Sequence, residues 1–413
     1  MVQSRWSKIA LSYLIIIAVI GTYMRLNFVI PLGAFNYENL LHSHSHVAIL
    51  GWVYSALYVG LIYSYLDSSA FSEKKYVYLF WLTQFTIIGM LVTFAIQGYA
   101  VFSIAFSSLH IIFSYFFIFF FTKDSRKDLK NRFIHSSSLP YIYASLIFLF
   151  ISSFGPWSLG ILANQKMIGS VLYRDAIYFY LHFQYNGWFT FAVLGLMLRL
   201  LEKKHIEINK RLFKIAFWLM FIPGFSSYLL SLSYDTIPGY LTYIAFSSGI
   251  IQLIGGVIYF IELLSNVNAI TIGNNKITRI LFYLFLVSLI SKFILQAASG
   301  LNKSNHIIFI NRDIVIGYIH LVMLGLITCG LFYLFVSEGF LKIKSFTERS
   351  GIVLFITGFV VTEIFLFSQF LIGIIDFSVI PYRMILFIFS VLILIGLLFF
   401  WLGQLYDKDF KEV

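Results

Sequence analysis

Residues 384–402 read MILFIFSVLILIGLLFFWL and contain no charged side chain. An uninterrupted apolar run of about 20 residues is long enough, as a helix, to cross the hydrocarbon core of a bilayer. No water reaches that core, so the backbone must satisfy its own hydrogen bonds within the segment. A continuous apolar run, rather than an alternating one, therefore predicts a helix and not a strand of a membrane barrel.

Similar runs recur along the whole chain. They lie near residues 10–30, 40–66, 77–97, 101–121, 139–160, 174–200, 213–233, 239–263, 278–298, 313–336, 352–375 and 380–404. The sequence therefore predicts an all-α integral membrane protein, a bundle of about twelve transmembrane helices. We expect residues 1–413 to form a single polytopic transmembrane domain, because no soluble domain fits between the runs.

Composition supports this class. The chain is 60% hydrophobic and 11% charged, with a mean hydropathy of +0.88, whereas soluble domains are about half apolar and a quarter charged. The first run is expected to be a helix rather than a signal peptide, because it is long and no small-residue cleavage site follows it. The net charge of +11 comes from residues between apolar runs. It therefore indicates contact with lipid head groups and not with nucleic acid.

The basic residues also predict a topology. Most of the 29 Lys and Arg residues lie in the two end segments and in alternate loops. A minority, which includes Arg25, Lys292 and Arg383, is assigned to the outer loops and the outer ends of helices. Positive charge collects in cytoplasmic loops, so both termini are predicted to be cytoplasmic, in what we expect to be a bacterial inner membrane.

Histidines are the candidate ligands. Six of the nine lie in spans predicted to run inward from the outer face, each within the outer half of the bilayer: His42, His44, His46, His110, His182 and His320. Imidazole binds haem iron, copper and zinc well, and polar groups inside a bilayer are often functional. The alternative is that each histidine hydrogen-bonds a neighbouring helix.

The segment His42-Ser-His44-Ser-His46 opens the second span. Positions i and i+4 of a helix share a face, whereas i+2 points nearly the opposite way. His42 and His46 can therefore face the bundle together, or His44 can, but not all three. His46 is the preferred ligand and His44 the next, and a surface metal site at this segment is also possible.

Three histidine segments resemble subunit I of the haem-copper oxidase superfamily, in the branch of the b-haem cytochrome c oxidases and nitric oxide reductases. They are residues 44–52 (HSHVAILGW), 312–325 (RDIVIGYIHLVMLG) and 180–188 (YLHFQYNGW). The resemblance implies twelve helices and a low-spin haem b held by His46, or His44, and by His320. It also implies electron transfer or the handling of oxygen or nitric oxide, with a quinol, a cytochrome or a partner subunit as electron donor.

The sequence departs from that family where copper would bind. The expected histidine pair in the seventh span is replaced by Gly-Phe-Ser-Ser-Tyr at residues 224–228, and hydroxyls do not substitute for two imidazoles. Tyr318 stands where the second haem would have its ligand. Oxidoreductase activity on a gas thus requires an unconventional second site, for which the candidate metal ligands are His182, His110, Tyr318 and His42.

Two further interpretations remain open. Arg312 and Arg383, near the outer helix ends, are candidate partners of haem propionates, although such arginines also serve as interfacial anchors. The alternative function is a polytopic transporter or metal-binding membrane protein without haem. Against a transporter, the sequence shows no repeated halves. The single cysteine, Cys329, excludes a disulfide within the chain and a covalently attached c-type haem.

Overall fold

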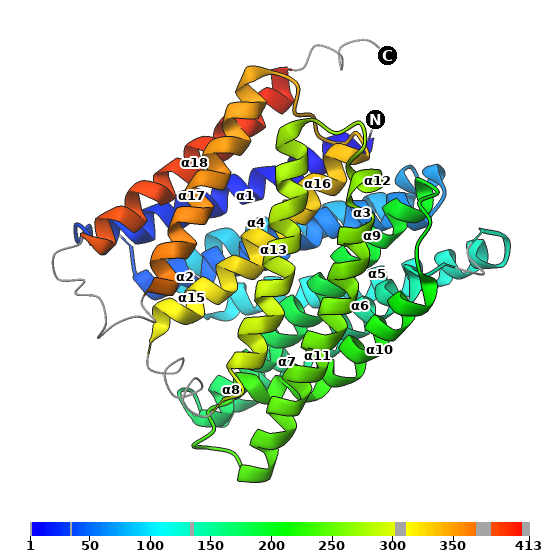
Figure 1. Cartoon of the computed structure of the whole chain (residues 1–413). Coiled ribbons are helices and arrows are strands. Elements are labelled where there is room, and N and C mark those ends of the chain that lie inside the picture. The colour runs from blue at the N-terminus through cyan, green and yellow to red at the C-terminus, as the bar shows by residue number, and fades with distance from the viewer. Residues whose placement is uncertain (1, 34, 133–135, 302–310, 369–380, 407–413) are drawn as a thin grey trace. The chain divides into compact units, whose positions relative to one another are not determined.

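The computed structural model describes residues 2–33, 35–132, 136–301, 311–368 and 381–406. Within these ranges every regular element is a helix (Figure 1). The described chain forms two compact units. Unit 1 comprises residues 1–129, 276–278 and 335–413, and unit 2 comprises residues 130–275 and 279–334. The expectation that residues 1–413 form a single transmembrane domain stays a prediction.

The expected all-helical membrane architecture is confirmed. Eleven helices of the described residues are long and apolar enough to cross a membrane, and each coincides with an expected span. The remaining expected span, 174–200, is also helical, over residues 171–203, but is not among the eleven. Its polar side chains, which include His182, Gln184 and Asn186, lower its hydropathy.

Unit 1 is built around the N-terminal and C-terminal helices. Its elements are α1 (Val2–Asn27), α2 (Tyr37–His46), the π-helical η1 (Val47–Val53), α3 (Tyr54–Tyr65), the short η2 (Ser68–Phe71), α4 (Lys74–Gln97), α5 (Val101–Arg132), α17 (Phe346–Ser368) and α18 (Tyr382–Tyr406). Asn36 fixes the start of α2, because its side-chain oxygen accepts the backbone N–H groups of Glu38 and Asn39. The last two helices, α17 and α18, lie side by side (Figure 1).

Glycines allow α17 and α18 to approach closely. A Cβ atom added at Gly351 would lie 2.5 Å from the backbone nitrogen of Phe400, and one added at Gly396 would lie 2.5 Å from that of Phe355. Small residues at a membrane helix interface permit this backbone contact.

Gly396→Val is therefore expected to destabilise unit 1, by about 1–3 kcal/mol for an overpacked contact. A lowered thermal unfolding midpoint in detergent measures the effect. Gly160→Ala is the control, because an added Cβ there meets no atom within 4 Å. Equal midpoints for Gly396→Val and wild type would contradict the close packing of α17 on α18.

Unit 2 contains α6 (Leu139–Ser152), α7 (Phe154–Asn164), α8 (Val171–Leu181), the π-helical η3 (His182–Phe189), α9 (Thr190–Lys203), α10 (Lys210–Ser226), the 3₁₀ turn η4 (Ser227–Ser231), α11 (Gly239–Ser265), α12 (Val267–Thr271), α15 (Arg312–His320) and the π-helical η5 (Leu321–Thr328). Most of α13 (Lys276–Ala298) and of α16 (Cys329–Ser337) also belongs to it. Helices α10 and α11 lie side by side (Figure 1).

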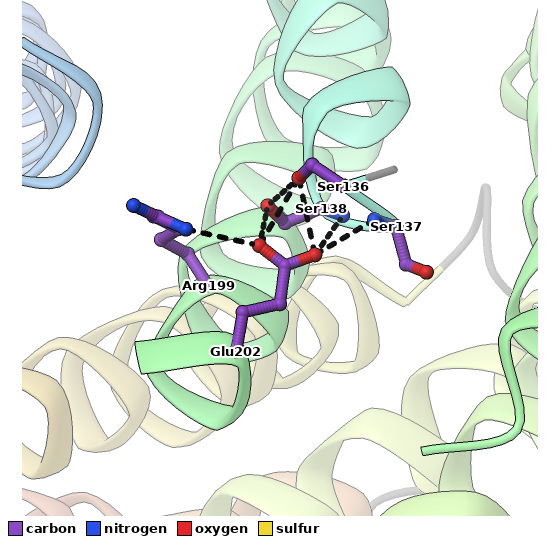
Figure 2. A network of polar contacts seen from close by, with 5 residues as sticks. All are labelled: Ser136, Ser137, Ser138, Arg199 and Glu202. Atoms are coloured by element: carbon purple, nitrogen blue, oxygen red, sulfur yellow. Dashed lines mark hydrogen bonds and ion pairs between the residues drawn. The ribbon is translucent and has the colours of Figure 1, made fainter. Parts of the chain in front are cut away.

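A carboxylate joins α9 to the start of α6 (Figure 2). Glu202 accepts the backbone N–H groups of Ser137 at 2.7 Å and Ser138 at 3.0 Å. It also accepts the hydroxyls of Ser136 at 3.0 Å and Ser138 at 2.9 Å, and Arg199 lies 3.3 Å away. The N–H groups at a helix start have no partner within the helix, so Glu202 supplies one from another helix.

Candidate functional site

The three histidine segments share a rare backbone conformation. Helix η1 begins directly after His46, η3 begins at His182, and η5 begins directly after His320. Well under 1% of residues in soluble proteins are π-helical, and π-helical turns occur frequently at functional sites. The three histidine segments are therefore also the three π-helical segments of the described chain.

His46 has a fixed tautomer. Its Nδ1 lies 2.8 Å from the backbone carbonyl oxygen of His42. A carbonyl only accepts, so Nδ1 carries the proton and Nε2 keeps its lone pair. The ring also stacks on Phe94, with ring centroids 4.1 Å apart and planes at 25°. A ring held through Nδ1–H to a carbonyl is the usual arrangement of a histidine that ligates iron through Nε2.

His42 and His44 lie on opposite faces of α2, as their spacing predicts. His42 packs against Tyr99, at a ring-centroid distance of 4.5 Å, on the side where His46 also lies. His44 instead lies against Gly21 of α1, where an added Cβ would be 3.0 Å from its Cε1. His44 therefore packs on the helix interface with α1, and His46 is the better oriented candidate ligand.

His110, on α5, is buried in unit 1. Thr86 donates its single hydroxyl proton to the carbonyl of Thr83 at 2.7 Å. Thr86 must then accept from His110 Nδ1, which lies 3.0 Å away, so the lone pair of His110 is on Nε2. Among the described residues no group hydrogen-bonds to that Nε2. His110 thus has a free acceptor, but among the described residues it belongs to no group of three metal-ligating side chains.

His182 uses both ring nitrogens in hydrogen bonds. Its Nε2 donates to the carbonyl of Gly224 at 3.0 Å, and its Nδ1 accepts from Asn186 at 3.3 Å. The amide oxygen of Asn186 in turn accepts the hydroxyl of Tyr318 at 3.0 Å. This chain joins η3, α10 and α15 within unit 2. For His182 the structure thus shows the alternative to a metal ligand, a histidine that hydrogen-bonds neighbouring helices. A metal ion at His182 would have to break one of these hydrogen bonds.

Tyr318→Phe tests this chain. The variant removes one interhelical hydrogen bond and leaves the ring, so we expect a loss of about 1 kcal/mol of stability and unchanged cofactor content. Thermal unfolding and absorption spectra of the purified variant measure the two effects. Loss of a bound metal or chromophore in Tyr318→Phe would show that the phenol is a ligand instead.

No three-ligand metal cluster is present in the parts of the chain that the structure describes, among His, Cys, Asp and Glu side chains. The serines at the expected copper position have other partners. Ser226 lies 2.7 Å from the hydroxyl of Ser248, and Ser227 donates to the carbonyl of Gly224 at 3.3 Å. These residues do not fit a copper ion of the oxidase type.

His320 ends α15 in unit 2 and is half-buried. Asn311 begins this helix by accepting the N–H of Asp313 at 3.0 Å. The exposed Arg312 is its first residue. Arg383, on α18 of unit 1, lies over the ring of Phe28 at 5.8 Å. The two expected axial ligands, His46 and His320, therefore come from different units, and the ligand role of His320 stays a prediction.

Sequence reasoning missed one buried cluster. It counted Lys292 only as a charge of the outer side, whereas the structure buries this lysine in unit 2, with Gln296 and Gln252 in a hydrogen-bonded chain. The sequence did contain a signal for this cluster. Lys292 lies within the apolar run 278–298, and a charged residue within a membrane span is costly and is often functional.

Comparisons with known proteins add no family. A search of protein-family models finds none that matches the chain, and a search of curated proteins finds no similar sequence.

Proposed function

We propose that this chain is an integral membrane protein that binds a low-spin b-type haem through His46 and His320. The observation that carries the proposal is the His46 ring, which donates Nδ1–H to the carbonyl of His42 and so keeps its Nε2 lone pair for a metal. Stacking on Phe94 holds the same ring in place. A bis-histidine haem supplies one-electron redox chemistry.

Two further features support the proposal. The backbone is π-helical next to both His46 and His320, and π-helical turns frequently accompany functional sites. The same two segments resemble the ligand segments of oxidase subunit I. Electron transfer is the function class that follows from a haem with two axial histidines, whereas the handling of oxygen or nitric oxide would require a second site. A quinol, a cytochrome or a partner subunit is the proposed electron donor.

A second, copper-containing centre is not part of the proposal. His182 is engaged through both nitrogens, and the seventh-span serines hydrogen-bond to other groups. The proposal therefore has one haem, with His46 oriented by His42 and with Arg312 and Arg383 as candidate propionate partners.

The proposed topology has twelve spans, with helix 171–203 as the sixth. Three of its polar side chains form hydrogen bonds within unit 2, since the NH₂ group of Gln184 donates to Ser152 at 2.9 Å and Asn186 pairs with His182 and Tyr318. Hydrogen-bonded polar groups are tolerated inside a bilayer at lower cost than free ones. An even number of spans puts both termini on one side, and the distribution of Lys and Arg residues predicts that this is the cytoplasmic side of a bacterial inner membrane.

The test is a reduced-minus-oxidised absorption spectrum of the detergent-purified full chain, with haem quantified per polypeptide. A single haem with a sharp low-spin α band is the expected result. Two haems, or a fraction that binds carbon monoxide, would mean that a second site exists. No haem after expression with ample haem supply would refute the proposal and leave the transporter or metal-binding alternative.

A further inference from the structure

Lys292 is a buried lysine that pairs with no carboxylate in the described residues of unit 2. It lies on α13 with 1% of its surface exposed, and in the described residues of unit 2 it is the one Lys, Arg, Asp or Glu side chain that is buried. Its ammonium donates to the amide oxygen of Gln296 at 2.8 Å and lies 4.0 Å from the ring centroid of Phe293. No ion pair to Lys292 occurs within the described ranges, so its charge has no acidic partner there.

The hydrogen bonds around Lys292 have a fixed direction. The chain ends at the backbone carbonyl of Met220, which only accepts, so Gln252 donates its NH₂ group to it at 3.0 Å. The oxygen of Gln252 then faces Gln296, which donates to it at 2.8 Å. Gln296 consequently turns its own oxygen toward Lys292.

This direction favours a cation at Lys292. Both side-chain amide dipoles have their negative ends toward the ammonium, and aligned hydrogen bonds polarise one another in a low-dielectric interior. Dipoles reduce the cost of a buried charge but do not neutralise it, and buried charges are normally paired with an opposite charge. An ammonium has three N–H donors, and Gln296 takes one of them.

We propose that unit 2 binds a small monovalent anion beside Lys292, as the counter-ion of this ammonium. A protonated lysine buried without an acidic partner is stabilised by one negative charge at its ammonium. Helix α11 packs closely on α13, where a Cβ added at Gly249 would lie 3.1 Å from the Cα of Ala297, so an ion bound between these helices has to be small. A halide-sized ion is therefore the ligand class, and chloride is the probe.

The experiment is thermal unfolding of the purified full chain in detergent, with chloride replacing gluconate at constant ionic strength. A ligand that binds the native state alone raises the unfolding midpoint until the site saturates. We expect this rise in the wild type and in Lys292→Arg, and no rise in Lys292→Met. Lys214→Met, which removes an exposed lysine of α10, is the matched control and keeps the rise.

Two results would overturn the inference. A wild-type midpoint independent of chloride would mean that Lys292 is a neutral amine, and a chloride effect that persists in Lys292→Met would place the ion elsewhere. Should Lys292→Met fail to fold, equilibrium dialysis with radioactive chloride decides on the wild type and Lys292→Arg. Saturable binding of about one ion per chain, a single-site stoichiometry, supports the site, and its absence overturns it.

Discussion

His46→Ala is expected to purify without the α band of a low-spin haem, while His44→Ala keeps it. The two histidines are two residues apart, equally polar and in the same helix, but they face opposite sides. His46 presents an Nε2 lone pair that no described residue uses, whereas His44 packs against Gly21 of α1. Alanine at position 46 removes an axial ligand, and alanine at position 44 removes a packing contact.

His320→Ala is expected to behave as His46→Ala does, because a low-spin haem needs both axial nitrogens. His182→Ala is the control for a buried histidine that is hydrogen-bonded through both nitrogens. It should lose stability and keep the spectrum. The measurement is haem per polypeptide together with the reduced spectrum of each variant.

The reverse pattern would be decisive as well. A band lost in His44→Ala and kept in His46→Ala would show that the ligand is the histidine facing α1. A band lost in His182→Ala but kept in His320→Ala would move the haem into the Asn186 and Tyr318 network of unit 2. Each outcome assigns the ligand to a different helix face.

The sequence predicts the helices well because hydrophobic length is a local property. Each expected apolar run coincides with a helix, and the opposite orientation of His44 relative to His42 and His46 follows from 3.6 residues per turn. The π-helical segments were not predictable. In a π-helical turn the backbone hydrogen bonds join residues five apart instead of four. The spacing of apolar residues does not mark the three places where this happens.

The buried networks escaped prediction for a different reason. Tyr318 donates to Asn186 across 132 residues of sequence, and spacing along one helix contains no information about such partners. The sixth span shows the consequence. Its histidine, glutamine and asparagine make helix 171–203 less apolar than the other spans, yet each of these side chains finds a partner on another helix of unit 2. The mean hydropathy of a segment depends on its residue types and contains no information about the hydrogen bonds that its polar side chains form.

Glu202→Ala is expected to be among the most destabilising single substitutions in unit 2. The carboxylate accepts two backbone N–H groups and the hydroxyls of Ser136 and Ser138, at 2.7 to 3.0 Å. Hydrogen bonds to a charged group contribute about 1.5–3 kcal/mol each, and buried donors left without an acceptor cost more than the mean. Since the donors share one carboxylate, the contributions are not additive, and a loss of about 3–5 kcal/mol is expected.

Glu202→Gln separates charge from hydrogen bonding at this position. Glutamine keeps one acceptor oxygen but replaces the other by an NH₂ group. The serine hydroxyls can accept a hydrogen bond from this NH₂ group, whereas the neighbouring N–H groups cannot, because they only donate. The unfolding midpoint of Glu202→Gln should therefore lie between those of the wild type and Glu202→Ala. Glu207→Gln, an exposed glutamate between α9 and α10, is the control and should unfold at the wild-type temperature. Equal midpoints for Glu202→Ala and Glu207→Gln would show that α6 begins without help from α9.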